Sequence, residues 1–320
     1  MKAFFVNNIN VGDELENEPF LIQDSISRET KDGRPYLLGT LRDNTGQIAF
    51  VFWDIPSYAE SWVNSGSAVL VTGRAVRYKD ALQITITDMN QNLEPTLADL
   101  LPASRRPREE MVAELKAQIS SLGDPWQKLV AHLLLNDNFL REFADAPAAR
   151  NMHHAYIGGL MEHTLSMAKL ANVLAAHYPF VNRDLLLSGT LLHDMGKAIE
   201  YDISKSFSFS EDGRLVGHIT RAVIMVEKAA AELGDFPEDK LRHLVHLVAS
   251  HHGTQEWGSP VVPKTLEAIL LHQIDLLDSR VQGFFDHLAN DSGEDDWTAK
   301  SSYMFGTELR RPDGFDWQSS

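Results

Sequence analysis

The sequence of 320 residues contains no cysteine. Disulfide bridges, zinc–thiolate sites and thiol catalysis are therefore excluded, and a metal ion would have to be bound by His, Asp, Glu or water. Such nitrogen and oxygen ligands suit Mn, Fe, Co, Ni, Zn or Mg. The chain also lacks an apolar run of about 18 residues, so no membrane span is expected.

The N-terminal segment, MKAFFVNNINVGDELENE, has neither a long apolar stretch nor a cleavage site of small residues. We therefore expect no secretory signal. The sequence predicts a cytoplasmic protein without a membrane partner.

Positive charge is scarce, and the formal net charge is -16. This balance opposes broad, nonspecific binding of nucleic acid, because counterion release needs a basic surface. Residues 1–108 carry a net charge of only -3, so the remaining 212 residues carry -13. A nucleic-acid surface is therefore expected in the first part of the chain.

The first 92 residues are typical of β-strands, with short β-branched and aromatic segments separated by turn residues. Five strands are predicted, at 20–30, 36–43, 46–54, 68–76 and 81–89. Residues 55–66 between the third and fourth strands are typical of one short helix that ends at Gly66. Five strands with a helix in this position predict an all-β OB-fold barrel over residues 1–92.

Residues 93–108 contain three prolines and a small basic run, which predicts a linker. Apolar residues then recur at spacings of three and four, a helical period. Seven helices are predicted, at 111–122, 126–136, 160–178, 183–199, 219–233, 239–252 and 266–289. We expect an all-α domain over residues 109–290 and an acidic C-terminal tail over 291–320.

Thirteen histidines are present, and several form an ordered set with aspartates along the predicted helices. A lone histidine is as readily a capping or surface residue as a ligand. An adjacent His-Asp pair at the end of an apolar helix is costly to bury unless it is coordinated or hydrogen-bonded. The set, in chain order, is His163, His193-Asp194, His218, His251-His252 and Asp275.

This order resembles the H…HD…D motif of the HD superfamily of metal-dependent phosphohydrolases. The additional histidines resemble the extended pattern of its two-metal members. The segments HHAYIGGLMEHTLSMA, LLHDMGK, LVGHI and SHHGTQEWGSPVVPKTLEAILLHQIDLLDS resemble the bacterial YhaM family of 3'-to-5' exoribonucleases, which place an OB-fold domain before an HD domain. The resemblance covers about residues 10–290 and is more specific in the HD part.

The resemblance implies a ligand set for one or two divalent ions, which would be Mn, Co, Mg, Fe or Ni. The first ion would be held by His163, His193, Asp194 and Asp275. Asp194 would bridge to a second ion bound by His218 and His251, with His252 as a further ligand or a phosphate contact.

Lys197 would stabilise charge at the phosphate or act as an acid–base partner beside the catalytic Asp194, although a solvated lysine at a helix turn fits the same pattern. Weaker candidates around the site are His153, His154 and Glu162.

The residue types suit phosphodiester hydrolysis. Two metal ions about 3.5–4 Å apart activate a water molecule and stabilise both the attacking and the leaving oxygen. No serine or cysteine nucleophile is required. Gly158-Gly159 lacks the spacing of a phosphate-binding loop.

The OB-like domain would bind the substrate, because such barrels hold single strands through aromatic platforms and basic grooves. Phe50 and Phe52 share one face of a predicted strand and fit a core position, so Trp53 on the opposite face is the better stacking residue. The candidate contacts are Arg42, Trp53, Arg74, Tyr78, Lys79 and Gln83.

We therefore expect a metal-dependent 3'-to-5' exoribonuclease that acts on single-stranded RNA, and on DNA as an open alternative. The oligomeric state is not determined by the sequence, and a homo-oligomer is compatible with it.

Three other functions remain open at this point. One is an HD phosphohydrolase of a small nucleotide, such as a cyclic dinucleotide, a dNTP or an alarmone. HHGTQEWGSP stands where cyclic-dinucleotide phosphodiesterases carry HHExxDGxGYP, but the GYP is missing. The second is a di-iron oxygenase, which uses a similar ligand set, and the third is a nucleic-acid-binding module without catalysis.

Overall fold

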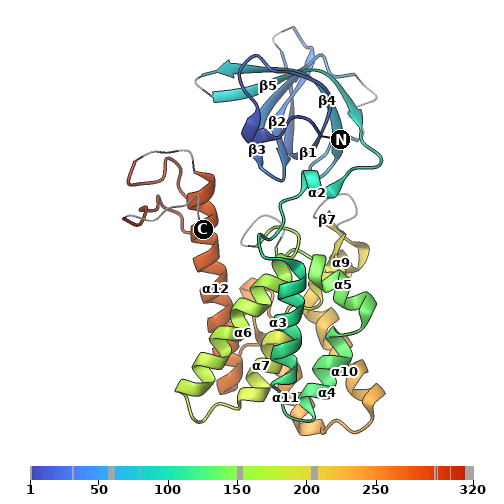
Figure 1. Cartoon of the computed structure of the whole chain (residues 1–320), viewed down its shortest axis with the longest axis vertical. Helices are drawn as coiled ribbons and strands as arrows, with labels where there is room; N and C mark the ends of the chain where they lie inside the picture. Colours follow the sequence, from blue (N-terminus) through green and yellow to red (C-terminus); the bar gives the residue numbers. More distant parts are fainter. Residues whose placement is uncertain are drawn as a thin grey trace. The chain divides into compact units, whose positions relative to one another are not determined.

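The computed structural model describes residues 2–30, 32–56, 62–79, 81–149, 154–202, 208–291, 293, 295–302 and 304–313 (Figure 1). The chain divides into two compact units. The first comprises Met1–Ala103 and Tyr201–Ser210, and the second comprises Ser104–Glu200 and Glu211–Ser320. No helix in the described ranges has the length and hydropathy of a membrane span.

The first unit contains a closed five-stranded barrel. Its strands are β1 (Glu14–Glu29), β2 (Pro35–Asp43), β3 (Gly46–Trp53), β4 (Ala68–Tyr78) and β5 (Ala81–Gln91). The order around the barrel is β1-β2-β3-β5-β4, and only the β3–β5 pair is parallel. The predicted OB-fold is therefore confirmed. The predicted helix at 55–66 falls partly on residues 57–61, which lie outside the described residues.

Alternation along β3 separates the barrel core from its outer surface. Ile48, Phe50 and Phe52 point inward and are buried, whereas Trp53 is 48% exposed. This follows from the two-residue period of a strand, which sends neighbouring side chains to opposite faces.

The second unit is helical. Its main helices are α3 (Arg108–Ser120), α4 (Trp126–Leu134), α5 (Asp137–Asp145), α6 (Gly159–His177), α7 (Arg183–Leu192), α10 (His218–Leu233), α11 (Glu238–Ser250) and α12 (Leu266–Asn290). Its shorter helices are α8 (Lys197–Glu200) and α9 (Glu211–Leu215), whereas α2 (Leu97–Leu100) and the strand pair β6 (Tyr201–Asp202) and β7 (Ser208–Phe209) belong to the first unit. The predicted all-α domain is thus confirmed, and each of the seven helices predicted between residues 111 and 289 has a counterpart.

Two details differ from the predicted helices. The sequence pattern did not reveal α5, which begins where the Asn136 side chain accepts hydrogen bonds from the backbone N–H groups of Asn138 and Phe139. The single helix predicted at 183–199 is wrong, because α7 ends at Leu192 and a turn precedes α8. At Gly196 in this turn, a Cβ would lie 2.2 Å from the carbonyl oxygen of His218, so the chain passes too close for any larger residue.

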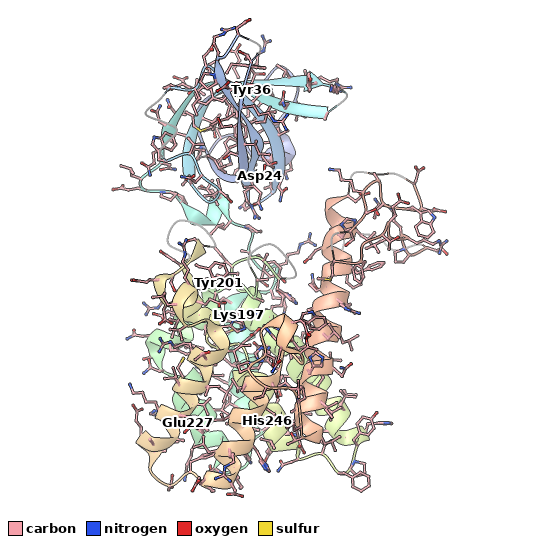
Figure 2. All side chains as sticks on the ribbon, turned by 180° about the vertical axis from the view of Figure 1, so that it is seen from behind. Asp24, Tyr36, Lys197, Tyr201, Glu227 and His246 are labelled. Atoms are coloured by element: carbon pink, nitrogen blue, oxygen red, sulfur yellow. The ribbon has the colours of Figure 1, made fainter. Side chains whose placement is uncertain are left out.

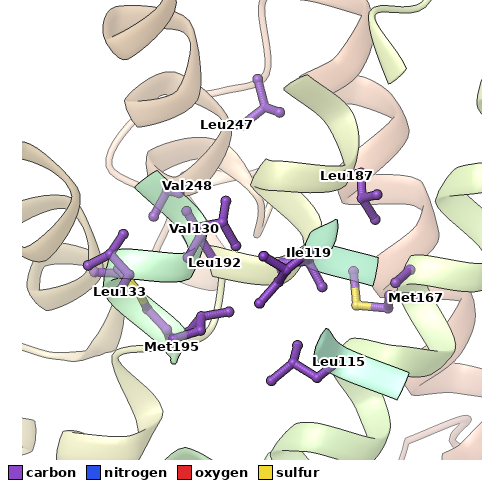
Figure 3. Packing of buried hydrophobic residues seen from close by; sticks show 14 of the residues in the cluster. Leu115, Ile119, Val130, Leu133, Met167, Leu187, Leu192, Met195, Leu247 and Val248 are labelled. Atoms are coloured by element: carbon purple, nitrogen blue, oxygen red, sulfur yellow. The ribbon is translucent and has the colours of Figure 1, made fainter. Parts of the chain in front are cut away.

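The apolar helix α7 lies at the centre of the helical unit. Every residue from Leu185 to Leu192 is buried, as expected for a helix that is apolar on all sides. Figure 3 shows Leu187 and Leu192 among residues of the surrounding helices. At Gly189, a Cβ would lie 2.6 Å from Leu247 on α11, so this glycine permits close helix packing. The His-Asp pair that follows α7 is thereby placed inside the unit.

The described part of the C-terminal segment follows α12 directly. Asp291 accepts hydrogen bonds from the N–H groups of Gly293 and Ala299 and forms an ion pair of 2.6 Å with Arg311. Two isolated β-bridges, Trp297 with Arg310 and Ser302 with Thr307, complete this segment.

Candidate metal centre

Five helices supply the predicted ligands. His163 lies on α6, His193 and Asp194 follow α7, His218 begins α10, His251 follows α11 and Asp275 lies on α12. Residues separated by more than one hundred positions thus converge inside the helical unit, where Lys197 is labelled in Figure 2. Four of the six side chains, those of His163, His193, Asp194 and His251, are almost completely buried.

The carboxylate of Asp194 lies between two groups of ligands. Its Oδ2 is 3.3 Å from Nε2 of His193 and 3.8 Å from Nε2 of His163. Its Oδ1 is 3.4 Å from Nε2 of both His218 and His251. Asp275 completes the first group, with its Oδ1 3.4 Å from Nε2 of His163.

Each group has the dimensions of a metal site. The potential ligand atoms of His163, His193 and Asp275 lie within 4.8 Å of one another, and so do those of Asp194, His218, His251 and His252. Because its two oxygens face different groups, Asp194 is placed to bridge two ions. The structure brings together all predicted ligands, including His252.

The Nδ1 atoms of the histidines are used for hydrogen bonds that orient the rings. Nδ1 of His193 donates to the carbonyl of Thr190 at 2.8 Å, and Nδ1 of His251 donates to that of Val248 at 2.7 Å. His252 donates in the same way to the carbonyl of Trp257 at 2.7 Å. Such partners select the tautomer that leaves Nε2 as the lone-pair donor.

The atoms that face the centre fit a divalent metal ion. Nε2 of His193, His218 and His251 and Oδ1 of Asp194 are buried, and within the described part of the chain they form no hydrogen bond. Buried polar atoms without a partner are costly unless another interaction satisfies them. A donor set of imidazole nitrogen and carboxylate oxygen is one that a divalent transition metal ion accepts.

Lys197 lies within the same cluster. Its Nζ donates a hydrogen bond of 2.6 Å to Oδ2 of Asp194, and the lysine side chain is only 11% exposed. Lys197 thus lies beside the candidate ligands, and the solvated surface position does not apply. Burial alone would raise the pKa of Asp194, but Lys197 and His193 lower it well below its ordinary value.

The electrostatics differ between the two groups. Burial alone would lower the pKa of His163, but the hydrogen bonds that its ring donates to Asp275 and Asp278 raise it to about 9. In the second group, burial and the neighbouring His251 lower the pKa of His252 to about 3. The first group is thus the more negative environment, and the second keeps His252 neutral.

Two carboxylates that the sequence pattern did not single out orient the ligands. Asp278 accepts a hydrogen bond of 2.7 Å from Nδ1 of His163, and Glu200 accepts one of 3.0 Å from Nδ1 of His218. Asp278 follows Asp275 by three residues and Glu200 follows Lys197 by three. That helical spacing puts each beside a candidate residue on one face and was the signal available in the sequence.

The weaker candidates His154 and Glu162 belong to a chain of hydrogen bonds behind His163. Nε2 of His154 lies 3.2 Å from Oδ2 of Asp278, and its Nδ1 lies 2.7 Å from the hydroxyl of Tyr156. Tyr156 in turn donates to Glu162 at 3.0 Å. These residues support the first group from behind rather than facing its centre, and His153 lies outside the described residues.

The candidate nucleic-acid contacts lie on the barrel. Trp53 stacks on Tyr36 of the neighbouring strand, with ring centroids 4.7 Å apart, which makes an exposed aromatic platform (Tyr36 is labelled in Figure 2). Arg42 is largely buried, and its guanidinium donates to Gln23 at 3.0 Å, so it is less available to a ligand.

The remaining candidates lie on β4 and β5 or the turn between them. Arg74, Tyr78 and Lys79 are exposed, and Gln83 is half-buried. Sequence reasoning did not include Tyr36, although its alternation with inward-facing Leu37 placed it on the outer face.

Comparison with known proteins gives two domain matches. The model of the HD domain matches residues 160–280, and that of the OB-fold nucleic acid binding domain matches residues 22–91. A structural match, to the HD domain of the phosphodiesterase PgpH of L. monocytogenes, has 17% identity, covers 50% of this chain and 74% of that chain, and has a TM-score of 0.27. A TM-score this low does not establish a shared fold.

Two curated relatives match most of the chain. The 3'-5' exoribonuclease YhaM of Geobacillus sp. (strain WCH70) is 36% identical over 275 residues, which are 85% of this chain and 84% of that protein. The protein of the same name from Bacillus pumilus (strain SAFR-032) is 35% identical over 276 residues, with coverage of 85% and 87%.

Proposed function

Since this chain belongs to the YhaM family of 3'-5' exoribonucleases, we propose that it hydrolyses single-stranded RNA from the 3' end at the cluster around Asp194. The observation that carries the proposal is the bridging position of Asp194. One of its oxygens faces His193 and the other faces His218 and His251, all with buried Nε2 atoms directed at it. The small-nucleotide phosphohydrolase has no better support.

In this proposal the first ion is held by His163, His193, Asp194 and Asp275, and the second by Asp194, His218 and His251 with His252. Mn, Co, Mg, Fe and Ni are all candidates, since the donor set accepts each of them. When bound, the ions supply an activated water and neutralise charge on the phosphate.

The residues of the chain contribute positioning and charge. The hydrogen bonds at Nδ1 hold the histidine rings in one orientation, so that the lone pairs at Nε2 converge before any ion arrives. The Nζ of Lys197 adds a positive charge beside Asp194, where it favours the negative charge that develops on a phosphodiester during hydrolysis. His252, held neutral and donating through Nδ1 to the carbonyl of Trp257, presents the lone pair of Nε2 to the second group.

The barrel is proposed to hold the single strand, with the Trp53–Tyr36 platform stacking a base and the exposed Arg74, Tyr78 and Lys79 near the backbone. Arg42 and Gln83 remain candidates at less exposed positions. Single-stranded DNA is proposed as a second substrate. The homo-oligomeric state and the cytoplasmic location stay predictions.

The test is hydrolysis of a 5'-labelled single-stranded RNA by the Mn-loaded protein. We expect the labelled strand to shorten progressively from its 3' end, and Asp194→Ala to abolish the ladder. Asp239→Ala, which removes an exposed carboxylate at the start of α11, is the control and should cleave normally. If the metal-loaded protein leaves the strand intact, the proposed exonuclease activity is wrong. Small nucleotides then become the substrates to test.

A further inference from the structure

The helix α12 carries more than one residue that serves the centre. His272, Asp275 and Asp278 follow one another at intervals of three residues, which places them along one side of the helix. Asp275 is a proposed ligand, and Asp278 orients His163 on α6. The side chain of His272 contacts the C-terminal end of α11.

His272 contacts the backbone of a proposed ligand. Its Nδ1 donates a hydrogen bond of 2.8 Å to the carbonyl oxygen of His251. His251 is the C-terminal cap of α11, where carbonyl groups have no partner within the helix. The imidazole of His272 satisfies this carbonyl and thereby ties the end of α11 to α12.

The adjoining loop is shaped around the same imidazole. Gly253 has a φ of +82°, and a Cβ there would lie 2.2 Å from Cε1 and 2.4 Å from Nε2 of His272. Any side chain at position 253 would therefore displace the ring or the loop. The loop also carries the carbonyl of Trp257 that orients His252.

From these contacts we propose that His272 is a positioning residue for the second metal group, and that it holds His251 and His252 at the spacing that the second ion needs. The inference deepens the proposed function, because it rests on the two-ion centre. Asp278 has the matching role for the first group through His163. A single helix thus aligns both groups, each through a separate hydrogen bond.

The experiment measures the number and affinity of Mn ions bound at equilibrium, independently of activity. Loss of an outer hydrogen-bond partner typically weakens a metal site by about 10- to 100-fold. We expect His272→Ala to weaken one of two ions by that factor and leave the other unchanged. Asp278→Asn should weaken the other ion instead.

Gly253→Ala tests the same contact while the imidazole itself is kept. It should weaken the same ion as His272→Ala, because the added methyl group displaces the ring. Gly234→Ala is the matched control. This glycine ends α10 with a φ of +75°, and a Cβ there meets nothing within 4 Å. It carries comparable backbone strain and should leave both affinities unchanged.

A double variant identifies the affected ion. In a His251→Ala background, His272→Ala should cause no further loss, because the residue it positions is already missing. In a His193→Ala background its effect should persist.

Failure of the inference and failure of the proposed function give different results. If the wild-type protein binds two ions and a folded His272→Ala variant keeps both affinities, His272 has no positioning role, although the two-ion centre stands. The same conclusion follows if Gly234→Ala weakens an ion as much as Gly253→Ala does. If the wild-type protein binds fewer than two ions, the two-ion centre and this inference are both wrong.

Discussion

The barrel and the helical unit place their candidate residues in opposite environments. In the helical unit His163, His193 and His251 are fully buried, and Asp194 is 2% exposed. On the barrel, Trp53, Arg74 and Tyr78 lie on the outer surface. A buried polar residue must be satisfied by a specific partner, whereas an exposed one is already satisfied by water. A motif of buried polar residues is therefore strong evidence for a site, and a motif of exposed ones is weak.

The two units also differ in their apolar cores, and we expect each unit to depend on its own core for stability. Phe50 in the barrel and Phe143 in α5 are both completely buried, and each belongs to a different cluster of apolar residues. We expect Phe50→Ala and Phe143→Ala each to lower the free energy of unfolding of its own unit by about 3–5 kcal/mol. Calorimetry, with tryptophan fluorescence as a second probe, should show one transition shifted in each variant. A common shift of all transitions would mean that the units unfold together.

The charge beside Asp194 should affect the chemical step and not the binding of the strand. Lys197→Met removes the buried ammonium group, and we expect kcat to fall by roughly 10²- to 10³-fold while KM for RNA and the bound metal are retained. Lys169→Met, which removes a surface lysine that is paired with Glu114, is the control. An unchanged kcat in Lys197→Met would show that this lysine only satisfies Asp194.

Loss of the aromatic platform should affect the binding of the strand and not the chemical step. Trp53→Ala removes one partner of the Trp53–Tyr36 stack, and we expect RNA binding to weaken by about 1–3 kcal/mol, with KM raised and kcat unchanged on saturating RNA. Trp297→Ala removes a similarly exposed tryptophan of the helical unit and should have no effect on binding. Equal affinities of the two variants would remove Trp53 from the proposed surface.

The smallest effect is expected for a single exposed charge on the barrel. Arg74→Gln should weaken RNA binding slightly and lower the slope of log affinity against log salt by about 0.7, the contribution of one phosphate contact in a single strand. Arg242→Gln removes an arginine that pairs with Glu238 on α11 and should leave the slope unchanged. Binding isotherms measured at several salt concentrations compare the two variants. Identical slopes would mean that Arg74 does not contact a phosphate of the RNA.

Much of the fold could be predicted from local patterns. The alternation in β3 and the apolar run of α7 predicted their structures because burial enforces these periods. The turn that carries His193 and Asp194 was missed, because Gly196 is required there by a contact with His218, more than twenty residues away. The helix α5 was overlooked because its nine residues are too few for the apolar spacing to repeat over several turns.

The sequence by itself determined the chemical inventory of the centre. Without cysteine, a metal site in this chain is limited to nitrogen and oxygen ligands, and histidines and aspartates at the ends of apolar helices supply them. The tertiary structure alone decided how these residues work together. It placed Asp194 between two groups of ligands and brought Asp278, Glu200 and His272 behind the histidines. Asp278 and His272 lie on α12 and Glu200 on α8, whereas the histidines that they contact belong to other helices. Helical periodicity determines which face of a helix is buried but not which neighbour that face meets.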